Sequence, residues 1–330
     1  MKAFVLSGFD RPPGFADVPT PEPGPGEIRV RVHATSVNPV DDMIRSGFFR
    51  AVQEYRFPAV FGRDLAGVVE TVGDGVTRFR AGDEVYGFVK RDYIGDGTFA
   101  EYVVVPENFF VAARPARLNL QQAGTLAMAG VTALECVEAV PSGPGHIVLV
   151  NGATGGLGTF AVQIAKARGA QVVATARSAD RVERIRSLGA DHVVDPTQGD
   201  LVKLVREVIP EGVDGFVDFV KHVDSAVMGQ GEDDAHREFA RLCRGVLREG
   251  GRAASVTNGG VPELMGPIPF ANVHSTPSPS NLARLSALVD ERGVTPVVME
   301  TFGFGDIEAA FGRLLAGGMA GKIAVWMTDS

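Results

Sequence analysis

The stretch with the most chemical content is rich in glycine and lies near the middle of the chain. Residues 148–158 read VLVNGATGGLG, an apolar run that ends in small residues. Small side chains let the backbone approach a ligand closely. A helix that begins at about Gly156 would direct unpaired N–H groups and a positive dipole end toward that ligand, which suits a pyrophosphate. The pattern predicts a dinucleotide site. The alternative is a glycine-rich turn without a ligand, because Ala153 replaces the first glycine of the usual motif.

The context of this turn strengthens the prediction. Residues 171–176 (QVVATA) predict the next strand, so residues 147–176 have the length of one strand–helix–strand unit. The cofactor-binding residues predicted in the turn are Asn151, Ala153, Thr154, Gly155, Gly156, Leu157 and Gly158.

The residues after the second strand of this unit predict which nicotinamide cofactor binds. An acidic residue there pairs with a free ribose 2′-hydroxyl, whereas a 2′-phosphate needs positive charge. The chain reads TARS at residues 175–178 and has no carboxylate before Asp180. Arg177 can make charge-assisted bonds to a phosphate, and Ser178 and Arg181 can add to them. We therefore predict NADPH rather than NADH. The alternative is that these arginines are solvated surface charges.

Composition excludes several other classes of protein. The chain has 330 residues, 45% of them hydrophobic and 22% charged, and a net charge of −8. The negative charge argues against a nucleic-acid partner, and no apolar run is long enough for a membrane span or a signal peptide. Cys136 and Cys243 lie in apolar, helix-like surroundings and are expected to be reduced core residues. The expected location is the cytoplasm.

The order of predicted elements divides the chain into two domains of an α/β protein. Residues 1–122 contain short strands without intervening helices, which indicates an antiparallel or barrel-like β domain. Residues 123–293 alternate strands and helices, which indicates a Rossmann domain with a doubly wound parallel sheet. Residues 294–330 return to a mixed texture and are expected to join the first domain. The predicted strands are 1–6, 27–34, 65–72, 84–88, 99–105, 147–150, 171–175, 192–194, 213–220, 252–256 and 271–274. The predicted helices are 121–140, 156–168, 179–188, 199–208, 236–248 and 281–291.

Several ordered stretches resemble one superfamily. They are VHATSVNPVDDMIRSG (32–47), GRDLAGVVETVGDGVTRFRAGDEVYGF (62–88), AGVTALECV (129–137), NGATGGLG (151–158) and GKIAVW (321–326). Together they resemble the medium-chain dehydrogenase/reductase superfamily, in particular its zinc-independent quinone oxidoreductase family. The resemblance implies a partly open β-barrel catalytic domain completed by the C-terminal tail. It also implies a homodimer.

The resemblance implies that no metal is bound. Zinc-dependent members carry a cysteine where this chain has Asn38, and Gly-His-Glu where it has Gly62, Arg63 and Asp64. A guanidinium and an amide cannot replace the thiolate and imidazole of a tetrahedral zinc site. Without a metal, hydride transfer still proceeds if the acceptor is already electrophilic, as quinones and α,β-unsaturated carbonyl compounds are.

The resemblance also assigns residues to the reaction. Asn38 would lie beside the nicotinamide and polarise or orient the substrate carbonyl; the alternative is a turn former before Pro39. Asp41 is expected to cap or orient the following helix. Thr132, Thr257 and Asn258 would contact the nicotinamide side of the cofactor, although Asn258 is also a natural turn residue.

Two departures from relatives concern the substrate. Related enoyl-thioester reductases use a tyrosine as proton donor where this chain has Phe48 and Phe49. We predict that Phe49 and Tyr55 line the substrate pocket. Residues 221–234 form a polar insert that either faces the substrate or is a surface excursion. The leading hypothesis is an NADPH-dependent reductase of a quinone or activated alkene. The alternatives are an enoyl-thioester reductase and a non-catalytic NADPH-binding scaffold protein.

Overall fold

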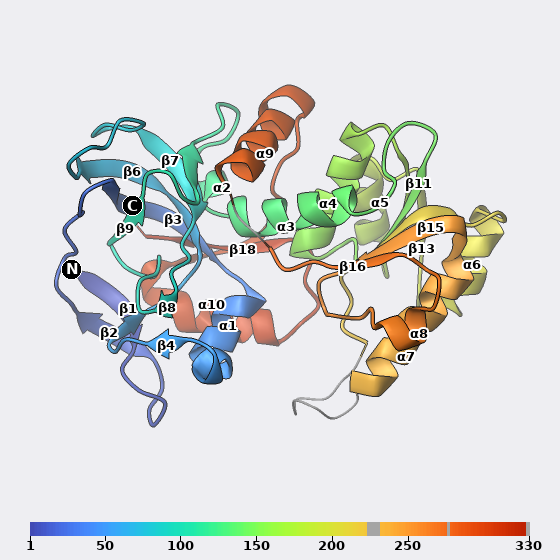
Figure 1. Ribbon diagram of the computed structural model, residues 1–330, viewed down its shortest axis with the longest axis horizontal. Helices are drawn as coiled ribbons and strands as arrows, with labels where there is room; N and C mark the ends of the chain where they lie inside the picture. Colours follow the sequence, from blue (N-terminus) through green and yellow to red (C-terminus); the bar gives the residue numbers. More distant parts are fainter. Residues whose placement is uncertain (223–231, 276–277, 328–330) are drawn as a thin grey trace. The chain divides into compact units, whose positions relative to one another are not determined.

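The structure, a computed structural model, describes residues 1–222, 232–275 and 278–327 (Figure 1). The chain divides into two compact units, Met1–Val131 with Pro277–Ser330 and Thr132–Thr276. Most of the insert predicted at residues 221–234 lies outside the described residues, so its role stays a prediction.

The second unit is built on one parallel sheet of six strands. Its strands are β11 (Ile147–Asn151), β12 (Gln171–Thr175), β13 (His192–Val194), β14 (Val213–Asp218), β15 (Leu247–Ser255) and β16 (Phe270–Asn272). Their order is β13-β12-β11-β14-β15-β16, and every neighbouring pair is parallel. Residues 148–150 and 172–174 are fully buried valine, leucine and alanine, as expected of strands that are covered on both faces. The prediction of a doubly wound sheet is confirmed.

Helices cover both faces of this sheet (Figure 1). They are α4 (Gly156–Ala167), α5 (Ala179–Ser187), α6 (Leu201–Val208), α7 (Glu232–Val246) and the short α8 (Pro262–Met265). Helices α4 and α5 lead outward from β11 to β13, whereas α6 returns the chain to β14 beside β11. Right-handed crossovers therefore put α6 on the face opposite α4 and α5. Phe216 of β14 and Phe239 of α7 stack in the core of this unit.

The first unit consists mainly of antiparallel sheets. The largest has the order β10-β7-β6-β3-β18-β17, and β9 also pairs with β3. Its strands are β3 (Glu27–Val37), β6 (Asp64–Val72), β7 (Glu84–Phe88), β9 (Tyr102–Pro106), β10 (Val111–Ala113), β17 (Val298–Gly303) and β18 (Lys322–Trp326). The smaller sheets contain β1 (Lys2–Leu6), β2 (Gly14–Asp17) and β5 (Ala59–Val60), and β4 (Glu54–Tyr55) and β8 (Tyr93–Ile94). The described strands form separate sheets and do not close into one barrel.

The C-terminal strand joins this unit, as the sequence predicts. β18 runs antiparallel to β3, with Ile323 opposite Val37 and Trp326 opposite Ala34. The helices of the unit are α1 (Pro39–Arg45), α2 (Leu120–Ala123), α9 (Pro279–Arg292) and α10 (Ile307–Leu315), and α3 (Ala127–Glu138) extends across the unit boundary. The rings of Phe61, Phe99 and Phe311 contact one another in the core.

The unit boundaries differ from those drawn at residues 122/123 and 293/294. The structure assigns α9 to the first unit, because its residues pack there. The Tyr86 hydroxyl donates to the Leu282 carbonyl (2.8 Å), and a Cβ on Gly130 would lie 2.7 Å from Leu285.

Two predicted helices also have other bounds. The helix predicted at 121–140 is interrupted between α2 and α3. The helix predicted at 236–248 ends at Val246, because β15 begins at Leu247 to pair with Val213 of β14.

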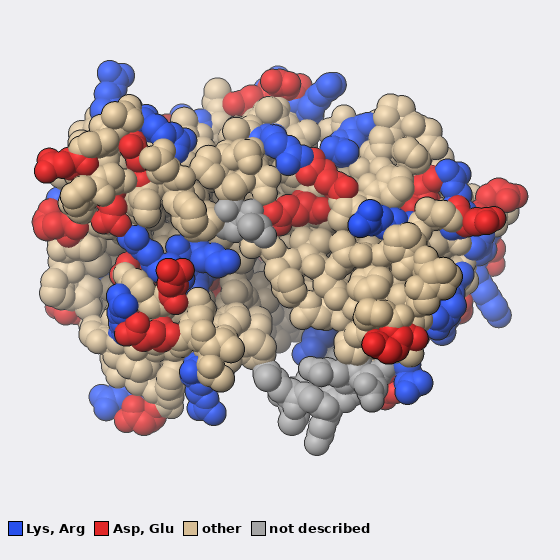
Figure 2. Space-filling view, viewed as in Figure 1, with Lys and Arg blue, Asp and Glu red and all other residues tan. Residues whose placement is uncertain are grey.

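Charges of both signs are interspersed over the face shown in Figure 2, with no large patch of one sign. Within the described ranges, no helix is both long and apolar enough to cross a membrane.

Candidate functional site

Three adjacent strands of the first unit place a polar cluster at one end of their sheet. Asn38 follows the last residue of β3, Lys322 begins β18 on one side, and Asp64 begins β6 on the other. Because Ile323 lies opposite Val37, the preceding lysine reaches the asparagine that follows Val37. The sheet thus gathers one amide, one ammonium and one carboxylate from distant parts of the sequence.

Asp64 is the centre of this cluster and is fully buried. Its Oδ1 accepts a hydrogen bond from the Met128 backbone N–H (2.8 Å). Its Oδ2 accepts from Ser36 Oγ (2.5 Å), Asn38 Nδ2 (3.0 Å) and Lys322 Nζ (3.3 Å). A buried carboxylate with this many donors, one of them a cation, is well compensated for the loss of water.

The Asn38 side chain is bound within the cluster at both ends. Its Nδ2 donates to Asp64 and is 3.3 Å from both Ser36 Oγ and Asp41 Oδ2. Its Oδ1 accepts from Lys322 Nζ. Asn38 also precedes Pro39 as the N-cap of α1. Because its donors have protein acceptors, the assignment of Asn38 to substrate polarisation stays a prediction.

Asp41 lies in the first turn of α1, and its predicted capping role is confirmed. Its Oδ2 accepts from the Asn38 backbone N–H (2.8 Å). Its Oδ1 is buried and has no hydrogen-bond partner in the described part of the chain. Burial raises the pKa of Asp41 to about 7, against an opposing effect of the Asn38 hydrogen bond.

Arg63 precedes Asp64 and is only 7% exposed. One guanidinium N–H donates to the Val89 carbonyl (2.8 Å). Burial lowers its pKa, whereas the charge of Asp41 raises it. No ion pair joins Arg63 to a carboxylate among the described residues.

The two predicted pocket residues are half-buried, and each contacts other aromatic rings. Phe49 contacts Phe48, and Tyr55 packs edge-on against Phe9 with ring centroids 4.9 Å apart. The Tyr55 hydroxyl donates to the Ile44 carbonyl (3.1 Å), and burial raises its pKa. Tyr55 is thus held by a structural hydrogen bond, and its place in a substrate pocket stays a prediction.

The cluster does not have the side chains of a zinc site. Among the described residues, no group of three or more His, Cys, Asp and Glu could hold a metal ion. Asp64 is surrounded by donors, two of which are the cation Lys322 and the amide of Asn38, and the neighbouring Arg63 is a second cation. Cations and amide N–H groups cannot act as zinc ligands.

The glycine turn of the second unit fits a dinucleotide phosphate. Gly152 has a positive φ of 77°, and a Cβ on Gly158 would lie 2.2 Å from the Gly152 carbonyl oxygen. The start of α4 therefore packs directly against the turn. In contrast, a Cβ on Gly155 would have one neighbour among the described residues, the Gly152 carbonyl oxygen at 3.5 Å. Gly155 is the N-cap of α4 and makes no side-chain cap, so the N–H groups of the first turn can bind a phosphate.

The three residues predicted to hold a 2′-phosphate lie at the start of α5. Arg177 is exposed and has no hydrogen bond or ion pair within the described ranges. Ser178, the N-cap of α5, donates its hydroxyl to Asp180 (2.6 Å). This hydrogen bond lowers the pKa of Asp180. Arg181 is half-buried in the first turn. Arg177 is therefore the side chain most available to a phosphate.

Asn151 lies in a hydrogen-bonded network across the carboxyl end of the parallel sheet. Its Nδ2 donates to Asp218 Oδ1 (3.0 Å), and its Oδ1 accepts from Thr175 Oγ1 (3.1 Å). Thr175 Oγ1 in turn accepts from the Gly152 N–H (2.9 Å). His222 Nε2 lies 2.5 Å from Asp218 Oδ2. This network fixes the start of the glycine turn through the hydrogen bond from the Gly152 N–H to Thr175.

The remaining predicted cofactor residues lie in three places: helix α3, the segment after β15, and the glycine turn. Thr132 is buried in α3. Thr257 Oγ1 is 3.0 Å from Ser255 Oγ. Asn258 is exposed and has a positive φ of 55°, a left-handed conformation that asparagine tolerates better than most residues. The other residues of the glycine turn, Ala153, Thr154, Gly156 and Leu157, follow β11 as predicted.

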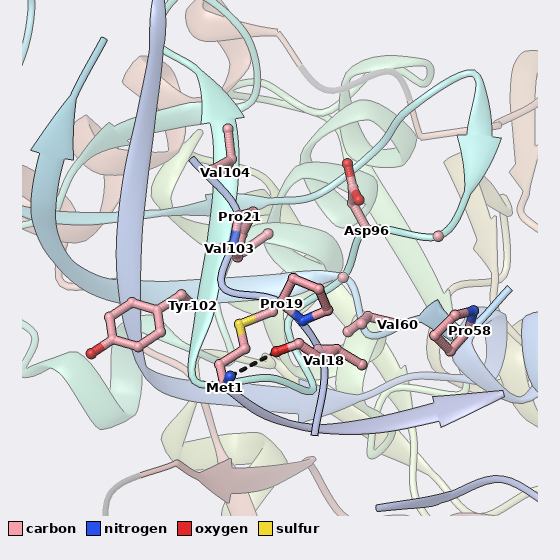
Figure 3. Close-up of a pocket in the computed structure, with 12 residues that line it drawn as sticks. Met1, Val18, Pro19, Pro21, Pro58, Val60, Asp96, Tyr102, Val103 and Val104 are labelled. Carbon is pink, nitrogen blue, oxygen red and sulfur yellow. Dashed lines mark hydrogen bonds between the residues drawn. The ribbon is translucent and has the colours of Figure 1, made fainter. Parts of the chain in front are cut away.

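Figure 3 shows a pocket elsewhere in the first unit, with a volume of about 240 Å³. It is lined mainly by apolar residues such as Met1, Pro58 and Val60, and the Met1 amino group donates to the Val18 carbonyl beside it (2.7 Å). None of the residues of the polar cluster or of the glycine turn line this pocket.

Sequence reasoning missed four residues that complete these networks. Lys322 and Asp64 lie inside the quoted motifs, but neither was assigned a role. Asp218 and His222 follow the i, i+4 spacing at the end of β14. A charged residue at the border of an apolar strand was the available signal, because such a residue needs a partner once it is buried.

Comparisons with known proteins agree with this architecture. The model of the alcohol dehydrogenase GroES-like domain matches residues 24–115, and that of the zinc-binding dehydrogenase matches residues 156–228. The chloroplast envelope quinone oxidoreductase homolog of Arabidopsis thaliana is 39% identical over 184 residues, 54% of this chain and 55% of that protein.

Two further relatives match nearly the whole chain. The chloroplastic NADPH-dependent alkenal/one oxidoreductase of Arabidopsis thaliana is 31% identical over 99% of this chain and 79% of its own length. The structure of the quinone oxidoreductase from Coxiella burnetii superposes with a TM-score of 0.83 at 25% identity and covers 99% of both chains.

Proposed function

Because this chain belongs to the medium-chain dehydrogenase/reductase superfamily, and within it to the quinone oxidoreductase family, it is an oxidoreductase, and we propose that it is an NADPH-dependent, zinc-independent reductase of quinones or α,β-unsaturated carbonyl compounds. The observation that carries this proposal is the polar cluster of the first unit. It holds the cation Lys322, lies next to a second cation, Arg63, and lacks the ligand set that would activate an alcohol through zinc.

The second unit supports the cofactor. The open position beside Gly155 and the uncapped start of α4 would hold the pyrophosphate. Arg177 would pair with the 2′-phosphate, with Arg181 one turn further along α5. When bound, a reduced nicotinamide supplies a hydride, and this requires an acceptor that is already electrophilic. A family relative named as an alkenal/one oxidoreductase agrees with such an acceptor.

The experiment that tests the proposal combines cofactor titration with turnover. The purified protein is titrated with NADPH and NADH, and NADPH oxidation is then followed with a small quinone, a 2-alkenal and an enoyl thioester. We expect tighter binding of NADPH and turnover of the quinone or the alkenal. Turnover of the thioester alone would contradict the substrate class. NADPH binding without any turnover would identify a scaffold protein. One zinc ion per chain in fresh protein would contradict zinc independence.

A variant of the glycine turn tests the cofactor site itself. Gly155→Val introduces a branched side chain into the open position of the turn and should weaken NADPH binding at least about 100-fold, since it blocks approach of the backbone to the pyrophosphate. Because the added Cβ would meet just the Gly152 carbonyl oxygen among the described residues, at an ordinary contact distance of 3.5 Å, the folded state should persist. Retained affinity would disprove the placement. Light scattering of the wild-type protein tests the homodimer that the family resemblance implies.

A further inference from the structure

Arg63 is a buried cation with most of its hydrogen-bonding capacity unused. A guanidinium carries five N–H donors. The structure gives Arg63 one acceptor, the Val89 carbonyl, and no ion pair with a carboxylate in the described part of the chain. The side chain is 7% exposed. Buried charges are normally paired, so an unpaired one indicates a ligand that is negative or becomes negative.

The neighbouring charges leave this cation uncompensated. The ammonium of Lys322, the other cation in this region, already donates hydrogen bonds to Asp64 and to Asn38, and the charge of Asp64 compensates its own. Asp41 is the carboxyl group whose charge most raises the pKa of Arg63. Burial raises the pKa of Asp41 itself to about 7, so much of this carboxyl is protonated at neutral pH. The cluster therefore carries an excess of positive charge, and that excess is on Arg63.

Arg63 also lies among the residues expected to meet the substrate. The charge of Arg63 tends to lower the pKa of Tyr55, a predicted pocket residue. It has the same effect on the pKa of Asp41, which caps the helix that follows Asn38. Asp64, the next residue along the chain, is hydrogen-bonded to Asn38 (3.0 Å). Arg63 is thus a cation with free donors that interacts electrostatically with a predicted pocket residue and directly precedes the central aspartate of the cluster.

We propose that Arg63 is a catalytic residue that donates hydrogen bonds to the carbonyl oxygen of the hydride acceptor and stabilises the negative charge that forms on it. This inference rests on the proposed function. An enone gains a hydride from the reduced nicotinamide at its β-carbon, and its π electrons shift toward the carbonyl, so that the oxygen becomes an enolate. A proton from water then adds to the α-carbon. A fixed cation in a site with little water stabilises such an oxyanion strongly.

The test compares Arg63→Met with a matched control, Lys90→Met, which removes an exposed charge from the same unit. We expect Arg63→Met to lower kcat for a small uncharged enone about 100-fold, which corresponds to about 2.7 kcal/mol, with KM changed less than about threefold. Arg63→Lys, which keeps the charge, should recover part of the loss. Lys90→Met should keep full activity. Because the replaced cation has no carboxylate partner and gives up only its hydrogen bond to the Val89 carbonyl, the urea midpoint of Arg63→Met should fall only slightly below that of the wild type.

A readout independent of turnover uses 4-nitrophenol as an analogue of the enolate. Its visible absorbance reports the fraction ionised, and the wild type should lower its pKa relative to Arg63→Met. Unchanged kcat and an unchanged nitrophenol pKa in Arg63→Met would overturn the inference, as would a large loss of stability that indicates a structural role. If the wild type reduces no acceptor but still lowers the nitrophenol pKa, the proposed function fails while the anion site stands.

Discussion

The two polar networks of the molecule are built alike but differ in what they leave free. Each has a fully buried aspartate held by a basic residue and an asparagine: Asp64 in the first unit and Asp218 in the second. The network of Asp218 is closed, since every named side chain has a partner within it. Next to Asp64, in contrast, Arg63 keeps unused donors and Asp41 keeps an unpaired oxygen.

This difference suits the two networks to different roles: one stabilises the backbone, and the other can bind a ligand. A closed network stabilises one arrangement of the backbone, here the turn at Gly152, whose N–H donates to Thr175. A network with spare donors retains the capacity to bind something else, and that capacity costs stability. The comparison predicts that charge removal in the two networks will have different consequences.

The largest effect is expected where a compensated buried charge loses its partner. Lys322→Met leaves Asp64 without a cation and should lower the free energy of unfolding by about 3 to 5 kcal/mol, measured by urea denaturation. The double variant Asp64→Asn with Lys322→Met removes both charges and should recover much of the loss. If Lys322→Met costs less than about 1 kcal/mol, the pair does not hold this part of the sheet together.

A somewhat smaller effect is expected from Asp41, and it depends on pH. The pKa of Asp41 is raised from 3.8 to about 7 by burial, so between those values the folded chain binds a proton that the unfolded chain has released. Stability should therefore fall as the pH rises from about 4 to 7, by roughly 2 to 4 kcal/mol. Asp41→Asn should flatten this decline in urea unfolding across the range. An unchanged slope would contradict the buried, protonated carboxyl.

The closed network offers the opposite test at His222. Burial lowers the pKa of His222, but the hydrogen bond to Asp218 and the negative charges of Asp218 and Glu238 together more than offset this effect and raise the pKa above its usual value. The stabilisation is therefore complete below the unfolded pKa of about 6.5 and is lost as the pH rises through the folded pKa. His222→Ala should cost about 1.5 to 3 kcal/mol at acidic pH and less at alkaline pH. An equal cost at both would show that packing, not charge, links the pair.

The smallest effects are expected at the exposed start of α5, outside both networks. Arg177→Ala should weaken NADPH binding about tenfold, or about 1.4 kcal/mol, and change NADH binding little, because only NADPH carries the 2′-phosphate. Asp180→Ala should tighten NADPH binding slightly, since it removes a carboxylate and frees the Ser178 hydroxyl. Both affinities are measured by fluorescence titration. Equal losses for the two cofactors in Arg177→Ala would contradict the 2′-phosphate assignment.

The second unit was largely readable from the sequence. Short valine-rich runs predicted β11, β12 and β13 within a residue of their ends, and the glycine turn followed β11 as expected. These features are local, because a buried parallel strand and a tight turn each depend on neighbouring residues. Helix bounds were less accurate where a strand took over residues with helical character, as at Leu247, where β15 begins.

The first unit shows what only the tertiary structure decided. The sequence by itself determined the fold class, the glycine turn and the absence of zinc-type ligands at Asn38 and Arg63. It did not indicate that Lys322 would meet Asp64, 258 positions earlier. That contact depends on the register in which β18 pairs with β3, and register is set by long-range packing. The same packing pairs the ammonium of Lys322 with Asp64 and Asn38 but leaves the guanidinium of Arg63 with free donors. Charge compensation depends on which groups are neighbours in space, and the sequence alone does not give these neighbours.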